Sequence, residues 1–310
     1  MSDDFIKNGI VNILKPTAMT SRDIVGWTKK TLDCRKAGHT GTLDPLAAGV
    51  LPVCLNKATK VIPHLPEQKK EYIAEMTLGV TTRTLDKEGD IVNKNNKWKR
   101  LSIKQIKTVF SDFNGEIDQI PPMFSAIKVN GKRLYEIARK NKEVTRASRR
   151  VILYKLEILK INLPYIQFKV ECSKGTYIRA LVRDIGEKLE TGAHLSFLVR
   201  TSSGPFTMKN AFTLKEIDSS ILKKKNLDNI IIPLDLPLNY PEMVIKEKSY
   251  KKAFNGNMLF KEDIKKGINP EKLSQDDNIL IYDINNNFIA IYRIDFSTAK
   301  TVMKAVRVFS

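Results

Sequence analysis

Hydrophobic residues recur at helical spacing in three stretches of the chain, and these stretches predict its main helices. A Thr-x-x-Asp capping box precedes the first stretch and predicts a helix over about 21–32. The second covers 103–113 after a serine cap, and the third covers 178–189. Arg179 lies outside the apolar stripe of the third helix, so position alone is typical of an ordinary surface arginine.

Other segments alternate apolar and polar residues, which is the period of a half-buried strand. One alternation begins at Tyr72, and another covers 166–173, where a glycine two residues later ends it. Helices and strands therefore mix without the regular repeat of a doubly wound sheet. We predict an α+β core with a mixed, mostly antiparallel sheet.

The sequence changes in character after residue 240. A lysine-rich stretch leads to short apolar segments within 278–309, two of which flank an Asn-Asn-Asn turn. This pattern predicts a small C-terminal β domain. We expect a catalytic domain over 1–240, with a basic insertion at about 120–150, and a small β domain over 241–310.

Composition indicates a folded protein with a polyanionic partner. The chain has 310 residues and 42% hydrophobic content, which is enough for a buried core. Its 53 Lys and Arg outnumber 34 Asp and Glu, giving a net charge of +19. This balance favours nucleic acid as the partner, although a biased genome composition is an alternative origin of the lysines.

Cysteine and histidine usage predicts neither disulfides nor a metal site. Cys34, Cys54 and Cys172 are odd in number and far apart, and the three histidines are equally scattered. The amino end has no secretory signature, and no apolar run has the length of a membrane span. We therefore expect a cytoplasmic protein without metal or membrane attachment.

The segment 128–150 is the most basic part of the chain, with nine Lys and Arg against two Glu and a local charge of +7. A solvated helix face is the ordinary explanation for such a run. The small number of core residues in the segment instead favours contact with RNA phosphates. The residues expected to make these contacts are Lys128, Lys132, Arg133, Arg149 and Arg150.

A single carboxylate, Asp44, lies in the small-residue stretch Gly-Thr-Leu-Asp-Pro-Leu-Ala-Ala-Gly. No other acid, His or Cys stands beside it in the sequence, so chemistry there would depend on one carboxylate. The alternative is structural, because Asp followed by Pro is a good start for a short helix that Asp44 would cap.

This stretch closely resembles the catalytic loop of the TruB-type pseudouridine synthases. Other blocks resemble the same family and occur in the family's order. They are Gly9–Pro16, Lys70–Ala74, Ile120–Gly131 and Cys172–Ala180. Ordered blocks are more specific than a lone motif, and together they cover the chain from about Gly9 to Phe206.

The resemblance implies the fold of the pseudouridine synthases, with a PUA-like RNA-binding domain at the C-terminal end. It also implies that Asp44 is the catalytic carboxylate and that Tyr72 stacks on the uracil. Arg179 should pair with Asp44 and keep it ionised. By position alone, Tyr72 could equally be a core aromatic residue at the end of a strand.

Three further residues match substrate-binding positions of the family. His39 matches the residue that fills the gap left by a flipped base, whereas Tyr177 and Leu198 match residues that line the pocket. The alternatives are a polar loop histidine and ordinary packing. Lys15 and Lys60 are weaker candidates for phosphate contacts, with solvated lysines as the alternative.

The family resemblance implies a stand-alone, cofactor-free enzyme that converts uridine 55 in the T-loop of tRNA to pseudouridine. The expected partner is the T-arm of tRNA, with no obligatory protein partner, and the expected state is a monomer. Two other functions stay open at this point. One is a guide-RNA-dependent pseudouridine synthase, and the other is a non-catalytic RNA-binding or tRNA-folding module.

Overall fold

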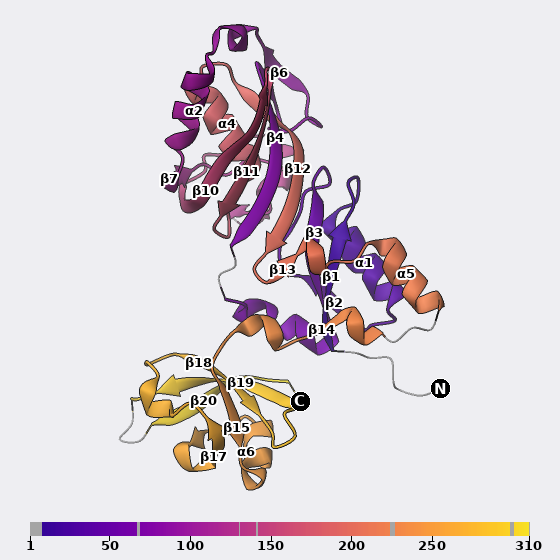
Figure 1. Cartoon of the computed structure of the whole chain (residues 1–310), viewed down its shortest axis with the longest axis vertical. Coiled ribbons are helices and arrows are strands. Elements are labelled where there is room, and N and C mark those ends of the chain that lie inside the picture. Colours follow the sequence, from indigo (N-terminus) through magenta and orange to yellow (C-terminus); the bar gives the residue numbers. More distant parts are fainter. Residues whose placement is uncertain are drawn as a thin grey trace.

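The computed structural model describes residues 8–66, 69–129, 131–140, 142–223, 227–297 and 301–309. It is elongated, with a large sheet above and a smaller sheet of C-terminal strands below (Figure 1). Within the described ranges, the large sheet has ten strands and the small one has six.

The large sheet has the order β14-β1-β3-β12-β4-β11-β10-β7, while β2 pairs with β3 and β13 with β12. Its strands are β1 (Gly9–Lys15), β2 (Ala37–His39), β3 (Ala48–Leu55), β4 (Lys70–Leu78), β7 (Gly115–Gln119), β10 (Arg149–Asn162), β11 (Tyr165–Cys172), β12 (Ala193–Ser203), β13 (Phe206–Thr207) and β14 (Ile231–Pro233). All of these pairs are antiparallel except β3 with β12. The predicted mixed, mostly antiparallel α+β core is therefore confirmed.

The parallel contact of β3 with β12 depends on a glycine. Gly49 has φ +110°, and a Cβ at this position would lie 2.2 Å from the carbonyl oxygen of Arg200. Only glycine allows two backbones to approach so closely in this conformation. The contact brings the loop before β3 against β12, where the candidate site forms.

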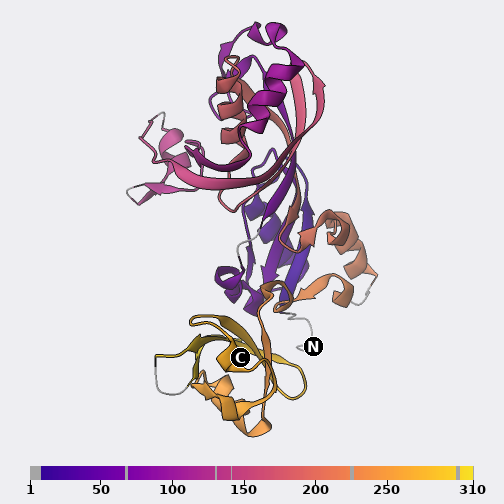
Figure 2. The ribbon, with the colours of Figure 1, turned by 60° about the vertical axis from the view of Figure 1, so that its left-hand side comes forward.

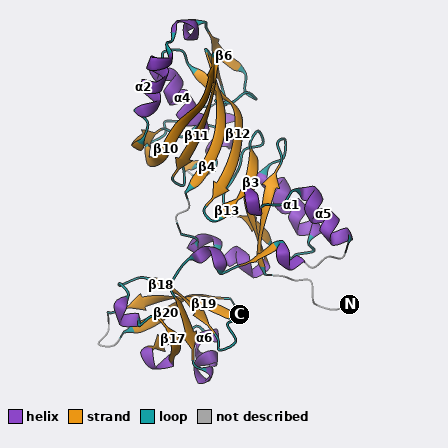
Figure 3. Ribbon diagram, viewed as in Figure 1, coloured by secondary structure: helices purple, strands orange, loops and turns teal. Residues whose placement is uncertain are grey.

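The helices are α1 (Ser21–Thr31), α2 (Ile103–Ser111), α3 (Leu134–Ala138), α4 (Ile178–Lys188), α5 (Leu214–Leu222) and α6 (Tyr250–Phe254) (Figure 3). Helices α1, α2, α4 and α5 pack on the core of the large sheet, and α1, α2 and α4 occur where the sequence predicts them. In contrast, α3 packs in the cluster around Leu134, and α6 packs against the small sheet. The capping boxes before α1 and α2 are both present, as expected. Ile185 of α4 and Phe168 of β11 are fully buried members of the same core.

The C-terminal strands form a sheet of order β16-β20-β19-β18-β15-β17, which confirms the predicted small β domain. The strands are β15 (Glu242–Ile245), β16 (Leu259–Phe260), β17 (Ile264–Gly267), β18 (Asn278–Tyr282), β19 (Phe288–Asp295) and β20 (Val302–Val308). Val61 and Leu238 pack with Leu280 in one apolar cluster. The hydroxyl of Tyr240 also donates to the carbonyl of His64 at 2.6 Å. The small sheet is thus attached to the larger part of the chain.

Two hairpins extend from the large sheet. One pairs β5 (Val80–Thr82) with β6 (Ile91–Lys94), and the other pairs β8 (Lys128–Val129) with β9 (Lys132–Arg133). The second hairpin projects with α3 away from the body of the molecule (Figure 2). A cluster around Leu134 and Met123 gives this projection its own small core.

Candidate active site

Asp44 lies in the loop 40–47, which connects β2 to β3. The N–H of Ala47 donates to the carbonyl of Asp44 at 3.0 Å and closes a turn, and no helix follows Pro45. The alternative in which Asp44 caps a short helix is therefore wrong. β3 begins at Ala48 and pairs with β1, which leaves no length for a helical turn.

The loop around Asp44 is anchored on both sides of the carboxylate. The N–H of Leu43 donates to Oγ of Ser21 at 2.8 Å, and the same hydroxyl donates to the carbonyl of Leu43 at 2.9 Å. Leu43 and Leu46 are both buried. Between these leucines the side chain of Asp44 is 38% exposed, so a fixed loop presents an accessible carboxylate.

Arg179 is the second residue of α4 and pairs with Asp44. Its Nε lies 2.9 Å from Oδ2 of Asp44, and its side chain is only 6% exposed. The surface-arginine alternative is therefore wrong. A helical stripe does not reveal this, because Arg179 is covered by loops from other parts of the chain rather than by the apolar core.

A second carboxylate, Asp86, binds the same guanidinium, and sequence reasoning missed it. Its Oδ2 lies 3.5 Å from Nη1 of Arg179, and its side chain is 7% exposed. Arg179 also donates to the carbonyls of Thr84, at 3.0 Å, and Phe124, at 2.9 Å. The guanidinium is thus held on several sides, which fixes the direction of its Nε toward Asp44.

The two carboxylates differ in their surroundings. Asp86 also accepts hydrogen bonds from the Thr84 hydroxyl and from the N–H of Glu88. In the described part of the chain, Arg179 is the sole ion-pair partner of Asp44. Asp86 is therefore a buried support for Arg179, whereas Asp44 has lone pairs available for a substrate.

Two tyrosines lie close enough to this centre for the charge of Asp44 to act on them. Tyr72 is on β4 and is 6% exposed. Tyr177 precedes α4 and is half-buried, and its backbone is held by Gln119 at 2.8 and 3.1 Å. Burial raises the pKa of both hydroxyls, and the negative charge of Asp44 contributes to both shifts. The structure thus brings Asp44 and both predicted tyrosines together.

Arg200 of β12 holds the other side of the loop and was also missed. It is fully buried and donates to the carbonyls of Val50 at 2.8 Å, Gly41 at 3.1 Å and Thr42 at 3.5 Å. Its side chain also hydrogen-bonds to the hydroxyl of Tyr72. Arg200 therefore joins the loop that carries Asp44 to the strand that carries Tyr72.

The remaining predicted residues lie at different depths. His39 is half-buried at the end of β2, and burial, Arg200 and Lys70 lower its pKa. Leu198 is buried in the core, so packing accounts for part of its role. Lys15 contradicts the expected phosphate contact, because it is 1% exposed and donates to backbone carbonyls, including that of Met19 at 2.7 Å.

The five predicted phosphate-binding residues lie on and beside the projecting insertion. Lys128, Lys132, Arg149 and Arg150 are exposed, whereas Arg133 is half-buried and contacts Tyr135. Arg150 has one acidic neighbour, Glu116 at 3.5 Å, in a well-exposed pair. An exposed pair of this kind contributes little to stability. The exposed positive side chains are therefore accessible to a polyanion.

The described ranges 8–66, 69–129, 131–140, 142–223, 227–297 and 301–309 offer neither a metal centre nor a membrane-spanning helix. They contain no group of three or more His, Cys, Asp or Glu that could hold a metal ion. They also contain no helix of the length and apolar character needed to cross a bilayer.

Family comparison identifies the chemistry of related proteins. Residues 29–178 match the N-terminal domain of the TruB family pseudouridylate synthases, and residues 179–239 match the C-terminal domain of tRNA pseudouridylate synthase B. The chain is 44% identical over 285 residues to the tRNA pseudouridine synthase B of Clostridium kluyveri, covering 92% of this chain and 94% of that protein. It is 40% identical over 305 residues to the corresponding protein of Clostridioides difficile, covering 97% and 99%.

Solved structures extend the likeness to three dimensions. A Cbf5–Nop10–Gar1 complex contains a chain that matches with a TM-score of 0.74 and 31% identity, covering 99% of this chain and 86% of that one. A structure of an H/ACA ribonucleoprotein bound to a substrate RNA containing 2′-deoxyuridine matches with a TM-score of 0.73 and 29% identity, at the same coverage.

Proposed function

The chain belongs to the TruB family of pseudouridylate synthases and is a tRNA pseudouridine synthase, and on this premise we propose that Asp44 acts on uridine 55 in the T-loop of tRNA. The reaction breaks the bond from uracil N1 to ribose C1′, rotates the base and joins C5 to C1′. The proton lost from C5 is balanced by one gained at N1. Nothing is oxidised, reduced or transferred to another molecule, so no cofactor is required.

The observation that carries this proposal is the pairing of an accessible Asp44 with a buried Arg179. Asp44 could attack C1′ as a nucleophile or remove the 2′ proton to give a glycal intermediate. Both routes need an ionised carboxylate with a free oxygen. The Arg179 guanidinium favours the ionised form and holds the carboxylate in one orientation.

We propose that the target uridine leaves the RNA stack to reach this carboxylate, at a cost of a few kcal/mol. The extruded uracil would stack on Tyr72, between Tyr177 and the apolar side chain of Leu198. His39, directly before the loop 40–47, would occupy the position in the RNA stack that the extruded uracil leaves. Burial favours its neutral imidazole, which suits insertion between bases.

The rest of the chain would bind the tRNA. We propose that residues 1–240 form the catalytic domain, that the basic insertion contacts the T-arm, and that residues 241–310 add an RNA-binding surface. All these parts belong to one chain, which supports a monomer without an obligatory protein partner. We propose that the enzyme is cytoplasmic, on the basis of its expected tRNA substrate.

The guide-RNA-dependent alternative is less well supported. This chain is more similar to the relatives named tRNA pseudouridine synthase B, at 40% and 44% identity, than to the matching chain of the Cbf5–Nop10–Gar1 complex, at 31%, which was solved as an assembly of several proteins. A module that only binds RNA would not need an accessible carboxylate held by a buried guanidinium. The Asp44–Arg179 pair therefore favours a stand-alone enzyme.

The test is to incubate the protein with an unmodified tRNA transcript and to map pseudouridine with a base-specific chemical method. We expect product at uridine 55 and none with Asp44→Asn, which keeps the size of the side chain but removes the charge. Asp33→Asn is the matched control, because Asp33 is exposed and has a left-handed backbone that asparagine tolerates. Activity of Asp44→Asn within a few-fold of the parent would contradict the assignment.

A further inference from the structure

Three basic side chains with restricted exposure surround the loop that carries Asp44. Lys15 donates to backbone carbonyls, among them that of Pro16 at 2.8 Å, and Arg200 donates to three others. Lys70 differs from both. Among the described residues it has no ion-pair partner, and its ammonium donates to no acceptor.

Lys70 lies beside the catalytic loop, close to Arg200. A Cβ added to Gly41 would lie 3.1 Å from Nζ of Lys70 and 3.7 Å from Nη1 of Arg200. The two cations therefore flank the same point next to Gly41. Burial, followed by the charge of Arg200, lowers the pKa of Lys70 to about 8, which reflects an ammonium without a counter-charge.

The groups around Lys70 add no negative charge. Lys174 and Arg200 both lower its pKa, and the neighbouring Cys172 has its own pKa raised to about 11 by burial, so this thiol is neutral at pH 7. His39 belongs to the same cluster, since Lys70 and Arg200 both lower its pKa. Its buried Nδ1 has no hydrogen-bond partner in the described structure.

A half-buried cation without a counter-charge and a buried ring nitrogen without a partner are both costly unless a ligand satisfies them. Lys70 is also two residues before Tyr72 on β4, so both side chains point to the same face of the sheet from Cα atoms about 7 Å apart. An anion bound at Lys70 would therefore lie within one nucleotide of a base stacked on Tyr72.

We propose that Lys70 binds a backbone phosphate of the substrate RNA next to the nucleotide on which Asp44 acts. The inference rests on the proposed function for the identity of the substrate. It gives the site a fixed phosphate contact beside the reacting sugar, separate from the contacts of the basic insertion. A phosphate is the one anion that an RNA presents at every nucleotide.

The experiment measures the coupling between Lys70 and individual phosphates. A T-arm stem–loop RNA is prepared with single neutral methylphosphonates at the phosphates around the target uridine. Binding of each RNA is compared for Lys70→Met and its parent, both in the full chain and both carrying Asp44→Asn to prevent conversion. Lys69→Met is the matched control, because it removes the same charge one residue away.

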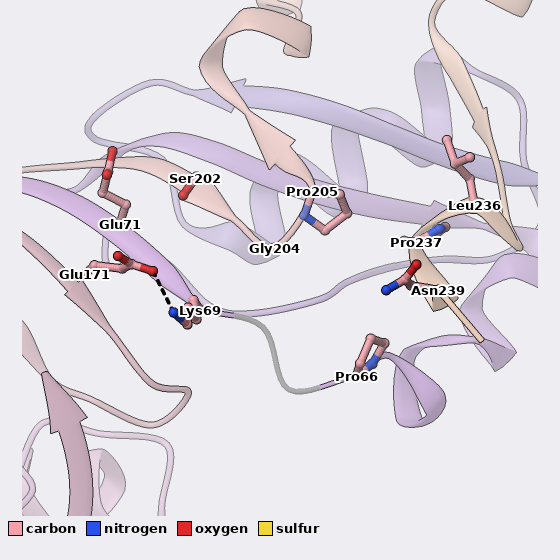
Figure 4. Close-up of a pocket in the computed structure, with 10 residues that line it drawn as sticks. All are labelled: Pro66, Lys69, Glu71, Glu171, Ser202, Gly204, Pro205, Leu236, Pro237 and Asn239. Atoms are coloured by element: carbon pink, nitrogen blue, oxygen red, sulfur yellow. Dashed lines mark ion pairs between the residues drawn. The ribbon is translucent and has the colours of Figure 1, made fainter. Parts of the chain in front are cut away.

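Lys69 has a different environment, which makes it a suitable control. Its Nζ pairs with Glu171 at 3.3 Å, and its side chain is 57% exposed. Both residues line a pocket of about 570 Å³ that also includes Pro205 and Leu236 (Figure 4). Asp44, Tyr72 and Lys70 do not line this pocket, so Lys69→Met tests loss of charge without loss of the proposed contact.

We expect Lys70→Met to weaken binding of the unmodified RNA about tenfold or more. One methylphosphonate within a nucleotide of the target should weaken binding to the parent by a similar factor and have no further effect on Lys70→Met. Lys69→Met should keep the parental pattern. Independent, multiplicative effects of Lys70→Met and of every methylphosphonate would overturn the proposal.

A second variant covers the case in which Lys70→Met does not fold, as judged by circular dichroism. Gly41→Ala keeps both cations but places a methyl group at the point that they flank. It should abolish the effect of the same methylphosphonate, and retention of that effect would count against the site. Because these are binding measurements on inactive protein, they are independent of the pseudouridine assay. Failure of the proposed function would appear only in that assay.

Discussion

The buried carboxylate of Asp86 lies 3.5 Å from Nη1 of Arg179, on the guanidinium that binds Asp44 through Nε. The Arg179 guanidinium thus lies between the accessible carboxylate of Asp44 and the buried carboxylate of Asp86. The enclosed acid, Asp86, has a side chain that is only 7% exposed. Its role is to hold Arg179 so that the guanidinium presents the same nitrogen to Asp44 in every turnover.

We predict that Asp86→Asn will slow the chemical step while leaving tRNA affinity within about twofold of the parent. Asparagine preserves shape but removes the charge that orients Arg179, and a misplacement of about 1 Å can cost on the order of 100-fold in rate. Single-turnover kinetics at saturating tRNA would measure this. Glu88→Gln, an exposed change in the same turn, is the control, and a parental rate for Asp86→Asn would show that Arg179 is held without it.

Arg200 supports the loop from the other side, and its removal should affect stability as well as rate. Arg200→Met leaves the carbonyls of Val50 and Gly41 buried without donors, at about 1–3 kcal/mol each. We expect the free energy of unfolding, measured by urea denaturation, to fall by about 3 kcal/mol. Arg293→Met, an exposed control on β19, should stay within about 0.5 kcal/mol. Equal stability of the two variants would contradict the structural role of Arg200.

Local sequence signals predicted the parts of the fold that depend on neighbouring residues. The capping box at Thr20 and the alternation in β11 each lie within a few residues, and the structure shows both elements. Asp86 and Arg200 do not give such a signal. Asp86 lies in a polar stretch typical of a solvated turn, and its burial depends on a bridge to Leu195 of β12.

The candidate site shows the same difference between what local sequence signals predict and what depends on contacts between distant parts of the chain. Family resemblance, rather than periodicity, led to Asp44, Tyr72 and Arg179, and the structure brings these residues together. For Lys15, the expected phosphate contact and the alternative of a solvated lysine are both wrong, because its side chain is buried. Its ammonium donates instead to the backbone carbonyls of Met19 and Pro45, which come together only in the folded chain.

The basic insertion should supply affinity rather than catalysis. We predict that changing Arg149 and Arg150 to Glu will weaken tRNA binding and make its dependence on salt shallower, because fewer counterions are released. The rate at saturating tRNA should stay near that of the parent. Binding isotherms at several salt concentrations measure this. Changing Lys104 and Lys107 to Glu alters the charge equally on the exposed side of α2, and an equal loss there would indicate a general charge effect.

Arg179→Lys should be a poor substitute although it keeps the positive charge. The guanidinium reaches Asp44 through Nε while its other nitrogens bind Asp86 and two carbonyls, and a lysine ammonium is a single point on a flexible stem. Asp44 would stay ionised but lose its orientation. We therefore expect a loss on the order of 100-fold in the single-turnover rate at saturating tRNA, with little change in affinity. Arg183→Lys, one helical turn further along α4, is the matched control. Near-parental kinetics for Arg179→Lys would mean that charge alone is sufficient and that orientation through Nε does not contribute.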